Sequence, residues 1–274
     1  DARIDYTGDQ IMATASSSAT TATVTLRANI LDITAATGDP STDTYSGDIR
    51  NARVKFVNRE TGADISVWLT PTLVVAGNMQ VGTVSVPYTV NLGTADALST
   101  TVGIVVSNGG YYERSTTNDD VVVTVYKPNG DFITGGGHIV VSKSEGSMKA
   151  DAGSKTNFGF NVKFNKTGKN LLGQLNFIFR RTESDGKVHV YQVKSNAMET
   201  LGVNVTNANS KTANFVSKCN ITDITNPLAP VPVGGNRKMY VTMVDNGEPG
   251  ANDIISFVLV DGNNDPTILS NILY

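Results

Sequence analysis

Ala22-Thr-Val-Thr-Leu-Arg-Ala-Asn-Ile-Leu31 is the stretch that decides the fold, because apolar and polar residues alternate along most of its length. Short segments rich in β-branched residues return in Val121-Val-Val-Thr-Val-Tyr126 and in Asn157-Phe-Gly-Phe-Asn-Val-Lys-Phe164. Successive side chains of a strand point to opposite faces of a sheet, so this pattern is typical of β-strands. No window shows the spacing and capping residues of an amphipathic helix. The sequence predicts an all-β protein with very little helix.

Composition excludes several classes of function. Charged residues make up 17% of the chain, and the net charge is −3. A chain without a basic field is a poor partner for nucleic acid, so we expect no nucleic-acid binding. No stretch reaches the roughly 18 consecutive apolar residues that a spanning helix needs, so we expect no membrane span.

Chain length favours two domains, because 274 residues is about twice the commonest domain size. The strand pattern stops at Lys127-Pro-Asn-Gly130 and then starts again. Seven or more short strands with frequent turns in each half are the signature of a sandwich. We therefore predict two immunoglobulin-like antiparallel β-sandwich domains in tandem, at residues 1–129 and 130–274, with the boundary within 126–133.

Two glycine-containing segments of the second half have a predicted local structure. Glu183-Ser-Asp-Gly186 is predicted to be a hairpin turn, because Asp-Gly accepts a positive φ. Gly135-Gly-Gly137 precedes a strand, and neither Lys-Ser/Thr nor a helix follows it. A bend or bulge in the first strand of this half is therefore expected there, rather than a phosphate-binding loop.

The residues available for catalysis are few. His138, His189 and Cys219 all lie at strand positions, where a buried side chain is a more common role than a nucleophile–base pair. The common hydrolase and metalloprotease motifs are missing from the sequence, and the single tryptophan, Trp68, offers no aromatic platform beside a carboxylate pair. We expect no enzyme. The single cysteine also excludes an intrachain disulfide.

Acidic and amide side chains gather in loops of the first half. If the strands follow immunoglobulin connectivity, the loop after Asp32 and the loop before Val121 emerge at the same end of the sandwich. Ca²⁺ takes six to eight oxygen ligands, so we predict a calcium site there. The alternative is that these residues are present because they form good turns. The candidate ligands are Asp32, Asp48, Asn118, Asp119 and Asp120.

A second acidic loop follows residues 238–244. It contains two glycines and could hold a cation or form a rigid turn, although its spacing is not that of an EF-hand. Its candidate ligands are Asp245, Asn246, Glu248 and Asp253. In addition, Tyr111 and Tyr112 follow Gly109-Gly110, and we expect them to be exposed and to contact a ligand.

The second half resembles a known family. Asp131-Phe-Ile-Thr-Gly-Gly-Gly-His138, Asn157-Phe-Gly-Phe-Asn-Val-Lys163 and Asp245-Asn-Gly-Glu-Pro-Gly-Ala-Asn-Asp253 are similar to the post-COAP-1-type β-sandwich module of secreted bacterial proteins. In the first half, Ser46-Gly-Asp-Ile-Arg-Asn-Ala-Arg-Val54 and Asn118-Asp-Asp-Val-Val-Val-Thr-Val125 look like the immunoglobulin-like repeat that often precedes it. Together these likenesses cover nearly the whole chain.

The resemblance implies a cellular location rather than a catalytic activity. Such modules occur in large secreted or cell-surface proteins, frequently of Bacteroidota, and the family supplies no catalytic residues to this sequence. We expect a structural or adhesive module, extracellular or at the cell surface and stiffened by calcium. Its partners would be other domains of the same surface protein and a glycan or protein receptor. The chain opens at Asp1-Ala-Arg, and we expect it to be a mature or excised segment of a longer protein.

A second function remains open from sequence alone. The chain could be a carbohydrate-binding accessory module of a polysaccharide-degrading enzyme. A row of exposed aromatic residues on one sheet face would favour that function, whereas the sequence offers only Trp68, Tyr88, Tyr111, Tyr112 and scattered further tyrosines.

Overall fold

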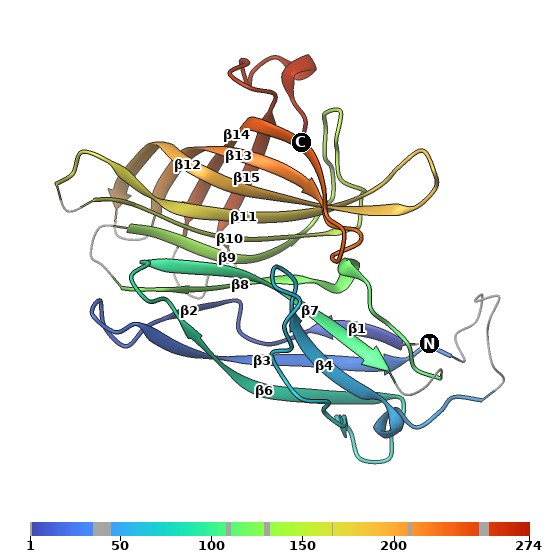
Figure 1. The fold of residues 1–274 in the computed structure, drawn as a ribbon. Helices are drawn as coiled ribbons and strands as arrows, with labels where there is room; N and C mark the ends of the chain where they lie inside the picture. Colours follow the sequence, from blue (N-terminus) through green and yellow to red (C-terminus); the bar gives the residue numbers. More distant parts are fainter. Residues whose placement is uncertain are drawn as a thin grey trace.

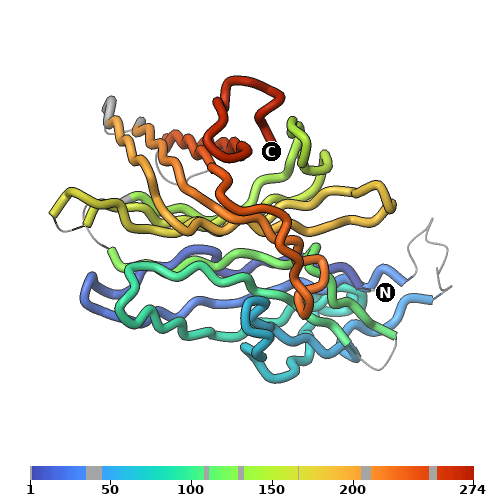
Figure 2. The backbone as a smooth tube through the Cα atoms, turned by 45° about the horizontal axis from the view of Figure 1, so that its top comes forward, coloured from blue at the N-terminus to red at the C-terminus, as the bar shows by residue number. Residues whose placement is uncertain are grey.

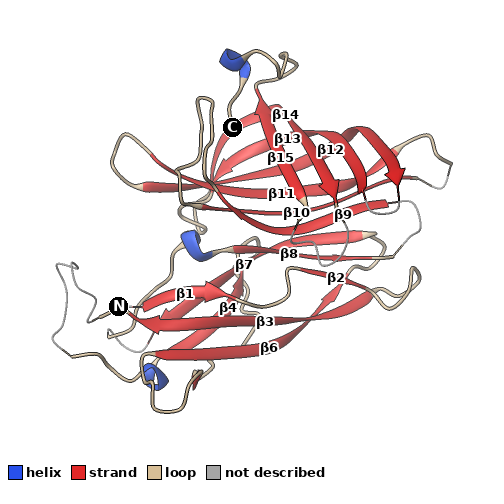
Figure 3. Cartoon of the chain, turned by 180° about the vertical axis from the view of Figure 1, so that it is seen from behind, coloured by secondary structure: helices blue, strands red, loops and turns tan. Residues whose placement is uncertain are grey.

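A computed structural model of the chain describes residues 2–34, 45–107, 111–128, 132–165, 167–207, 210–246 and 252–274. Strands form nearly all of the regular structure in these ranges (Figure 3). The exceptions are three single-turn 3₁₀ segments, η1 (Ile49–Asn51), η2 (Thr117–Asp119) and η3 (Leu269–Asn271). The prediction of an all-β protein is confirmed. No helix within the described ranges is long and apolar enough to cross a membrane.

The first half consists of two facing four-stranded sheets. Sheet A has the order β1-β3-β6-β5, and sheet B has the order β2-β8-β7-β4. All of the pairs are antiparallel except β2 with β8, which is parallel. The strands are β1 (Ala2–Tyr6), β2 (Ile11–Ala13), β3 (Thr21–Asp32), β4 (Arg53–Asn58), β5 (Thr72–Leu73), β6 (Val81–Asn91), β7 (Ala97–Ser107) and β8 (Val121–Tyr126).

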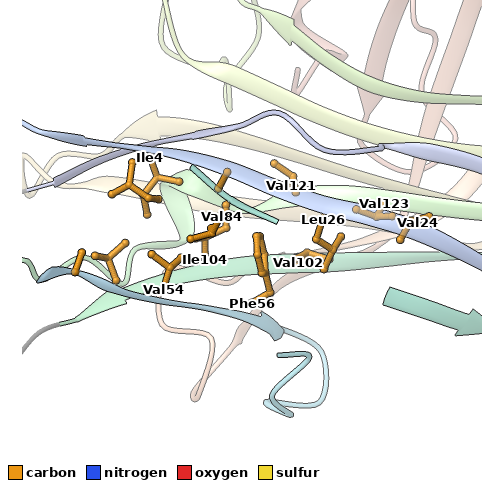
Figure 4. Packing of buried hydrophobic residues seen from close by; sticks show 14 of the residues in the cluster. Ile4, Val24, Leu26, Val54, Phe56, Val84, Val102, Ile104, Val121 and Val123 are labelled. Carbon is orange, nitrogen blue, oxygen red and sulfur yellow. The ribbon is translucent and has the colours of Figure 1, made fainter. Parts of the chain in front are cut away.

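The alternation that opens the sequence places one face of β3 in the core between these sheets. Val24, Leu26 and Ile30 are fully buried, whereas Arg27, which points to the other face, is exposed. Figure 4 shows Leu26 of sheet A close to Phe56 of sheet B within the same apolar cluster. Burial of one face of each sheet therefore stabilises this half.

The second half is a single curled sheet, which we call sheet C. Its seven strands have the order β15-β14-β13-β12-β11-β10-β9, so every strand pairs antiparallel with its neighbours in sequence. The predicted second sandwich of two facing sheets is not the arrangement found. The strands are β9 (Phe132–Val140), β10 (Lys155–Phe164), β11 (Leu171–Thr182), β12 (Val188–Asn207), β13 (Ser210–Asp223), β14 (Val231–Asp245) and β15 (Ile254–Val260).

Sheet C has a core of its own, on the inside of the curl. Phe177 is fully buried there, and Tyr274 contacts it edge-on with ring centroids 5.0 Å apart. The long strand β12 carries two register shifts between residues 195 and 200 in its pairing with β13. Such bulges bend a strand and increase its twist, which gives the sheet its curl.

Sheet B lies between the other two sheets, so the molecule has three layers (Figures 1 and 2). Alternate residues of β8 face opposite layers. Val121 and Val123 belong to the core against sheet A, whereas Val122 packs with Ile178 and Val190 of sheet C. A strand that is buried on both faces is apolar almost throughout, which accounts for the composition of residues 121–126.

Glycines permit the close approach of sheets B and C. Gly136 of β9 and Gly159 of β10 are cross-strand partners. A Cβ atom on Gly159 would overlap Oγ1 of Thr124, and one on Gly136 would lie 3.2 Å from the carbonyl oxygen of Gln10. The register runs through Gly135-Gly-Gly137 without a shift, so the predicted bulge is wrong. These glycines make room for the neighbouring layer and for the ring of Phe160.

The residues of the two main cores lie on either side of the predicted boundary. The core of sheets A and B extends to Val125, and the core of sheet C begins at Ile133. The hairpin turn at residues 183–186 is confirmed, because the N–H of Gly186 donates to the carbonyl of Glu183 and Gly186 has φ 78°. The division into domains at residues 129 and 130 stays a prediction.

The close contact of sheets B and C predicts the effect of a single added methyl group. Gly159→Ala forces the backbone of β10 away from Thr124, and we expect it to lower the free energy of unfolding by about 1–3 kcal/mol. Gly137→Ala is the control, because its new Cβ would lie 3.7 Å from the ring of Phe158, an ordinary contact. Denaturant unfolding measures both variants. Equal stability of the two would contradict the proposed packing.

Candidate functional site

The candidate site is the loop pole, which we define as residues 32–34, 45–51, 74–80 and 111–114 at one end of the first half. Asp32, the last residue of β3, holds its loops together. Its carboxylate accepts hydrogen bonds from the N–H of Thr34 at 2.9 Å, the N–H of Gly47 at 2.6 Å and the hydroxyl of Tyr112 at 2.9 Å. Burial favours a raised pKa for Asp32, but these donors outweigh burial and lower that pKa. Asp32 is therefore a structural anchor of the pole.

The two adjacent tyrosines differ in exposure. Tyr112 is fully buried, so the expectation that both would be exposed is wrong for this residue. Tyr111 is 41% exposed and meets the ring of Tyr112 edge-on, with centroids 4.7 Å apart. Tyr112 therefore supports the loops from inside, and Tyr111 is the member of the pair that can reach a ligand.

Three other predicted ligands of the first loop cluster form ion pairs with arginine. The pairs are Asp48–Arg50 at 2.9 Å, Asp119–Arg114 at 2.9 Å and Asp120–Arg59 at 3.0 Å. Arg59 lies sixty-one residues from Asp120 in the chain, so no local sequence signal indicates the pairing. These arginines offset the negative charge of the carboxylates, a role that the calcium prediction assigned to a cation.

Calcium binding by the first loop cluster stays a prediction. Within the described ranges, no group of three or more His, Cys, Asp or Glu side chains is placed to hold a metal ion. Asn118 is the remaining predicted ligand, and its Oδ1 atom is buried without a hydrogen-bond partner. The ion pairs and the turn hydrogen bonds offer a second explanation of why acidic residues occur here.

The second predicted cluster lies between β14 and β15. The N–H of Asn246 donates to Oδ1 of Asp253 at 2.9 Å, and its side-chain amide donates to the carbonyl of Asn252 at 2.7 Å. Asp245 faces Lys211 of β13 at 3.9 Å. Glu248 lies outside the described residues. These hydrogen bonds bring the two ends of the loop together. Calcium binding at this loop also stays a prediction.

A buried arginine that the sequence analysis missed joins the two halves. Arg180 of β11 is 3% exposed. Its guanidinium donates to the carbonyl of Lys155 at 2.7 Å and to Oδ1 of Asn157 at 2.5 Å, both on its own sheet. It also donates to the carbonyls of Asp120 at 2.8 Å and Thr117 at 3.3 Å, in the loop that leads into sheet B. One side chain of β11 therefore connects β10 with η2 and with Asp120, the residue that precedes β8.

Burial shifts the protonation of the groups around this arginine. It lowers the pKa of Arg180 to about 10, although the negative charge of Asp120 acts in the opposite direction and favours a raised pKa. It also raises the pKa of Asp120, and the facing charge of Arg59 opposes that shift. These groups lie where water is excluded, so each depends on its protein partners for hydrogen bonds.

Further polar contacts extend along the junction of sheets B and C. The side-chain amides of Asn176 and Gln192 both donate to Oγ1 of Thr101, at 3.1 and 2.9 Å. At the rim, ion pairs Lys163–Asp96 at 2.8 Å and Lys194–Glu60 at 3.0 Å link the same layers. Hydrogen bonds and ion pairs therefore hold the junction together in addition to its apolar contacts.

The three residues considered for catalysis do not form a catalytic group in the described part of the chain. Cys219 is fully buried, and burial raises the pKa of its thiol to about 12. His189 bonds through Nδ1 to Asp223 at 2.6 Å and lies 3.5 Å from Asp185. His138 is on β9, where burial lowers its pKa. No hydrogen bond joins Cys219 to either histidine.

Comparisons of the chain with protein-family models, with curated proteins and with solved structures find no match. The resemblance to the post-COAP-1-type module and to an immunoglobulin-like repeat therefore stays a prediction.

The two histidines predict opposite effects of pH on stability. The hydrogen bond that His189 donates to Asp223 raises the pKa of His189, so its stabilising charge is present below pH of about 6.5 and is lost as pH rises through the folded-state pKa. We expect His189→Gln to cost more stability at about pH 5.5 than at about pH 9. Thermal melts of both proteins at the two pH values measure this difference.

His138→Gln is the control for that experiment. Burial lowers the pKa of His138, so its neutral form stabilises the folded protein above its unfolded pKa, and that stability is lost as pH falls. The difference between wild type and this variant should therefore change with pH in the opposite direction. A cost of His189→Gln that is the same at both pH values would contradict a charged His189–Asp223 pair.

Proposed function

We propose that the chain is a non-catalytic structural and adhesive module of a secreted or cell-surface bacterial protein. In this proposal the first half is an immunoglobulin-like sandwich and the second half is a post-COAP-1-type module. The observation that carries it is the junction of sheets B and C, where the buried Arg180 holds both halves in one orientation. The loop pole is the surface that meets a glycan or protein receptor.

The junction supports a structural role because domains of one chain move relative to each other unless their interface is extensive. Here one face of sheet B is covered by sheet A and the other by sheet C. Polar contacts across the second face fix the register of the layers as well as their distance. A module built in this way keeps its two ends at a constant separation, which suits a spacer in a surface protein.

Exposed side chains at the loop pole support an adhesive role. Tyr45 is 80% exposed, and Gly47, two residues further on, packs against Tyr111. Val75 and Met79, on the hairpin between β5 and β6, are 60% and 47% exposed. Exposed apolar and aromatic groups that gather in one region mark interaction surfaces. Such a surface could contact a protein or the apolar face of a sugar.

A carbohydrate-binding accessory module is the second candidate function. Tyr45 and Tyr111 favour it, because exposed tyrosine rings can stack on sugars. Trp68, which is 45% exposed, has Lys55 over its ring at 4.7 Å. Binding to a defined glycan, rather than to protein, would favour this candidate.

The structural part of the proposal predicts a large effect of Arg180→Met. The variant leaves the carbonyl of Asp120 and Oδ1 of Asn157 buried without their guanidinium donor, and we expect a loss of about 3–5 kcal/mol of stability. Protease cleavage within residues 127–131 should become faster as the halves separate. Arg181→Met is the matched control, because Arg181 is only partly buried and pairs with Glu183. A variant Arg180→Met that is as stable and resistant as Arg181→Met would refute the rigid junction.

The adhesive part predicts a loss of binding when the loop pole is changed. Labelled protein is tested on a glycan array and on immobilised extracellular-matrix proteins. We expect Tyr111→Ala and Tyr45→Ala each to weaken any binding about tenfold, since exposed tyrosines carry much of the energy of such contacts. Leu228→Ala is the control, because Leu228 is 88% exposed but lies on the β13–β14 hairpin. Binding that neither tyrosine affects would place the contact surface elsewhere.

A further inference from the structure

The two edge strands of sheet C face each other across an open seam. Strands β9 and β15 are at opposite ends of the strand order, yet the curl of the sheet brings them to the two sides of one groove of about 320 Å³. In the described part of the chain, no backbone hydrogen bond joins residues 139–145 to residues 254–258. Apolar residues on its two sides are Ile139, Val140, Val141, Ile255, Phe257 and Val258, and Ile272 and Tyr274 also line the groove.

An extended segment of the chain already lies at one end of this seam. On one side, the N–H of Leu259 donates to the carbonyl of Tyr274 at 2.9 Å, and the N–H of Leu273 donates to Leu259 at 2.7 Å. On the other side, the N–H of Met148, in the loop between β9 and β10, donates to the carbonyl of Leu273 at 2.6 Å. The segment Ile272–Tyr274 thus lies as an added strand segment between β15 and this loop.

The rest of the seam has backbone groups oriented to accept a strand. Because Leu259 bonds outward to Leu273 and Tyr274, the alternation of a strand also turns the N–H and C=O of Phe257 and Ile255 outward. On the other side, Val141 bonds to Ser154, so the backbone groups of its neighbour Val140 point to the seam. Both edges can therefore bond to an added strand.

These edges also lack the features that normally block strand addition. Prolines and unpaired charges protect many edge strands. Residues 231–237 of β14, which extend beyond the pairing with β15, contain Pro232 and follow Pro230. The seam edges contain no proline, and the charges lining the groove, Lys143 and Glu145, pair with each other at 3.0 Å.

The geometry defines the occupant. A strand between β9 and β15 must have both of its edges free, and each described strand of a second copy already has at least one edge paired. The groove has no unpaired charge and is largely apolar, so side chains that point inward would cover Ile139, Ile255 and Phe257. We propose that the seam binds an extended, uncharged segment of a partner polypeptide, which adds to sheet C as a strand antiparallel to β15.

Strand addition goes beyond the proposed function and takes place at a different surface. Strand addition depends on the edges of sheet C, whereas adhesion depends on the loop pole. Tyr111→Ala should therefore leave strand addition unchanged, and the two proposals can fail separately.

Hydrogen exchange of the full chain tests the proposal with a defined probe. The probe is a capped, neutral peptide of about seven residues that alternates Val with Thr or Asn, the pattern that strand addition requires. A peptide with Pro in place of each Val is the negative control. We expect the amides of Val140, Ile255 and Phe257 to exchange at least about tenfold more slowly with the probe, and not with the control.

A variant at the seam separates strand addition from other contacts. Val140→Pro removes the N–H that points to the seam but keeps the bonds of β9 to β10, and we expect it to weaken probe binding about tenfold. Val140→Thr keeps that N–H, so it should bind like wild type. Unchanged exchange of the β10 amides shows that the proline variant is folded.

Several outcomes would overturn the proposal. Protection at only one of the two edges, or equal binding by Val140→Pro and wild type, would exclude an inserted strand. A concentration-dependent dimer that Val140→Pro abolishes would identify a second copy as the occupant instead of a different polypeptide. Absence of any protection by the alternating peptide at millimolar concentration would show that the seam does not accept strands.

Discussion

The buried guanidinium of Arg180 is the constraint on which the arrangement of the layers depends. It lies at the junction of sheets B and C and donates to acceptors on β10, on η2 and on Asp120, which precedes β8. A buried arginine needs protein acceptors in place of water, and without it the carbonyl of Asp120 and Oδ1 of Asn157 would lose a buried donor. The layers must therefore approach closely, and Gly136 and Gly159 are the residues that allow this.

This constraint explains the unusual chemistry of sheet B. Its face toward sheet A is apolar, as in an ordinary sandwich, but its face toward sheet C carries Ser99, Thr101 and Thr124, all buried. Ser99 and Thr124 bond to each other at 2.9 Å, and Thr101 accepts from two amides of sheet C. Apolar contact alone would permit sliding between layers, whereas these directional bonds specify one register.

The sequence predicts local features such as strands and loops, but not the contacts between residues that lie far apart in the chain. Alternation identified β3 and β10 and the all-β class, because the two-residue period follows from strand geometry itself. It could not show that seven strands form one curled sheet instead of two facing sheets, since alternation does not say which strands pair. Loop composition likewise placed Asp32 at the end of a strand and Asp120 in a loop, but their partners Tyr112 and Arg59 lie eighty and sixty-one residues away. The sequence therefore predicted a metal without indicating the arginine and tyrosine partners of these carboxylates.

The fixed junction and the open seam have a common cause. Contacts with sheet B come from β9, β10 and β11, which the glycines and Arg180 hold against it. Beyond β11, the bulges of β12 between residues 195 and 200 turn the sheet away and around its own core. The curl brings β15 back toward β9, but β9 is held in place by the layer below it. Ile272–Tyr274 bonds to β15 and to the loop between β9 and β10, so the edges of β9 and β15 beside this segment stay unpaired.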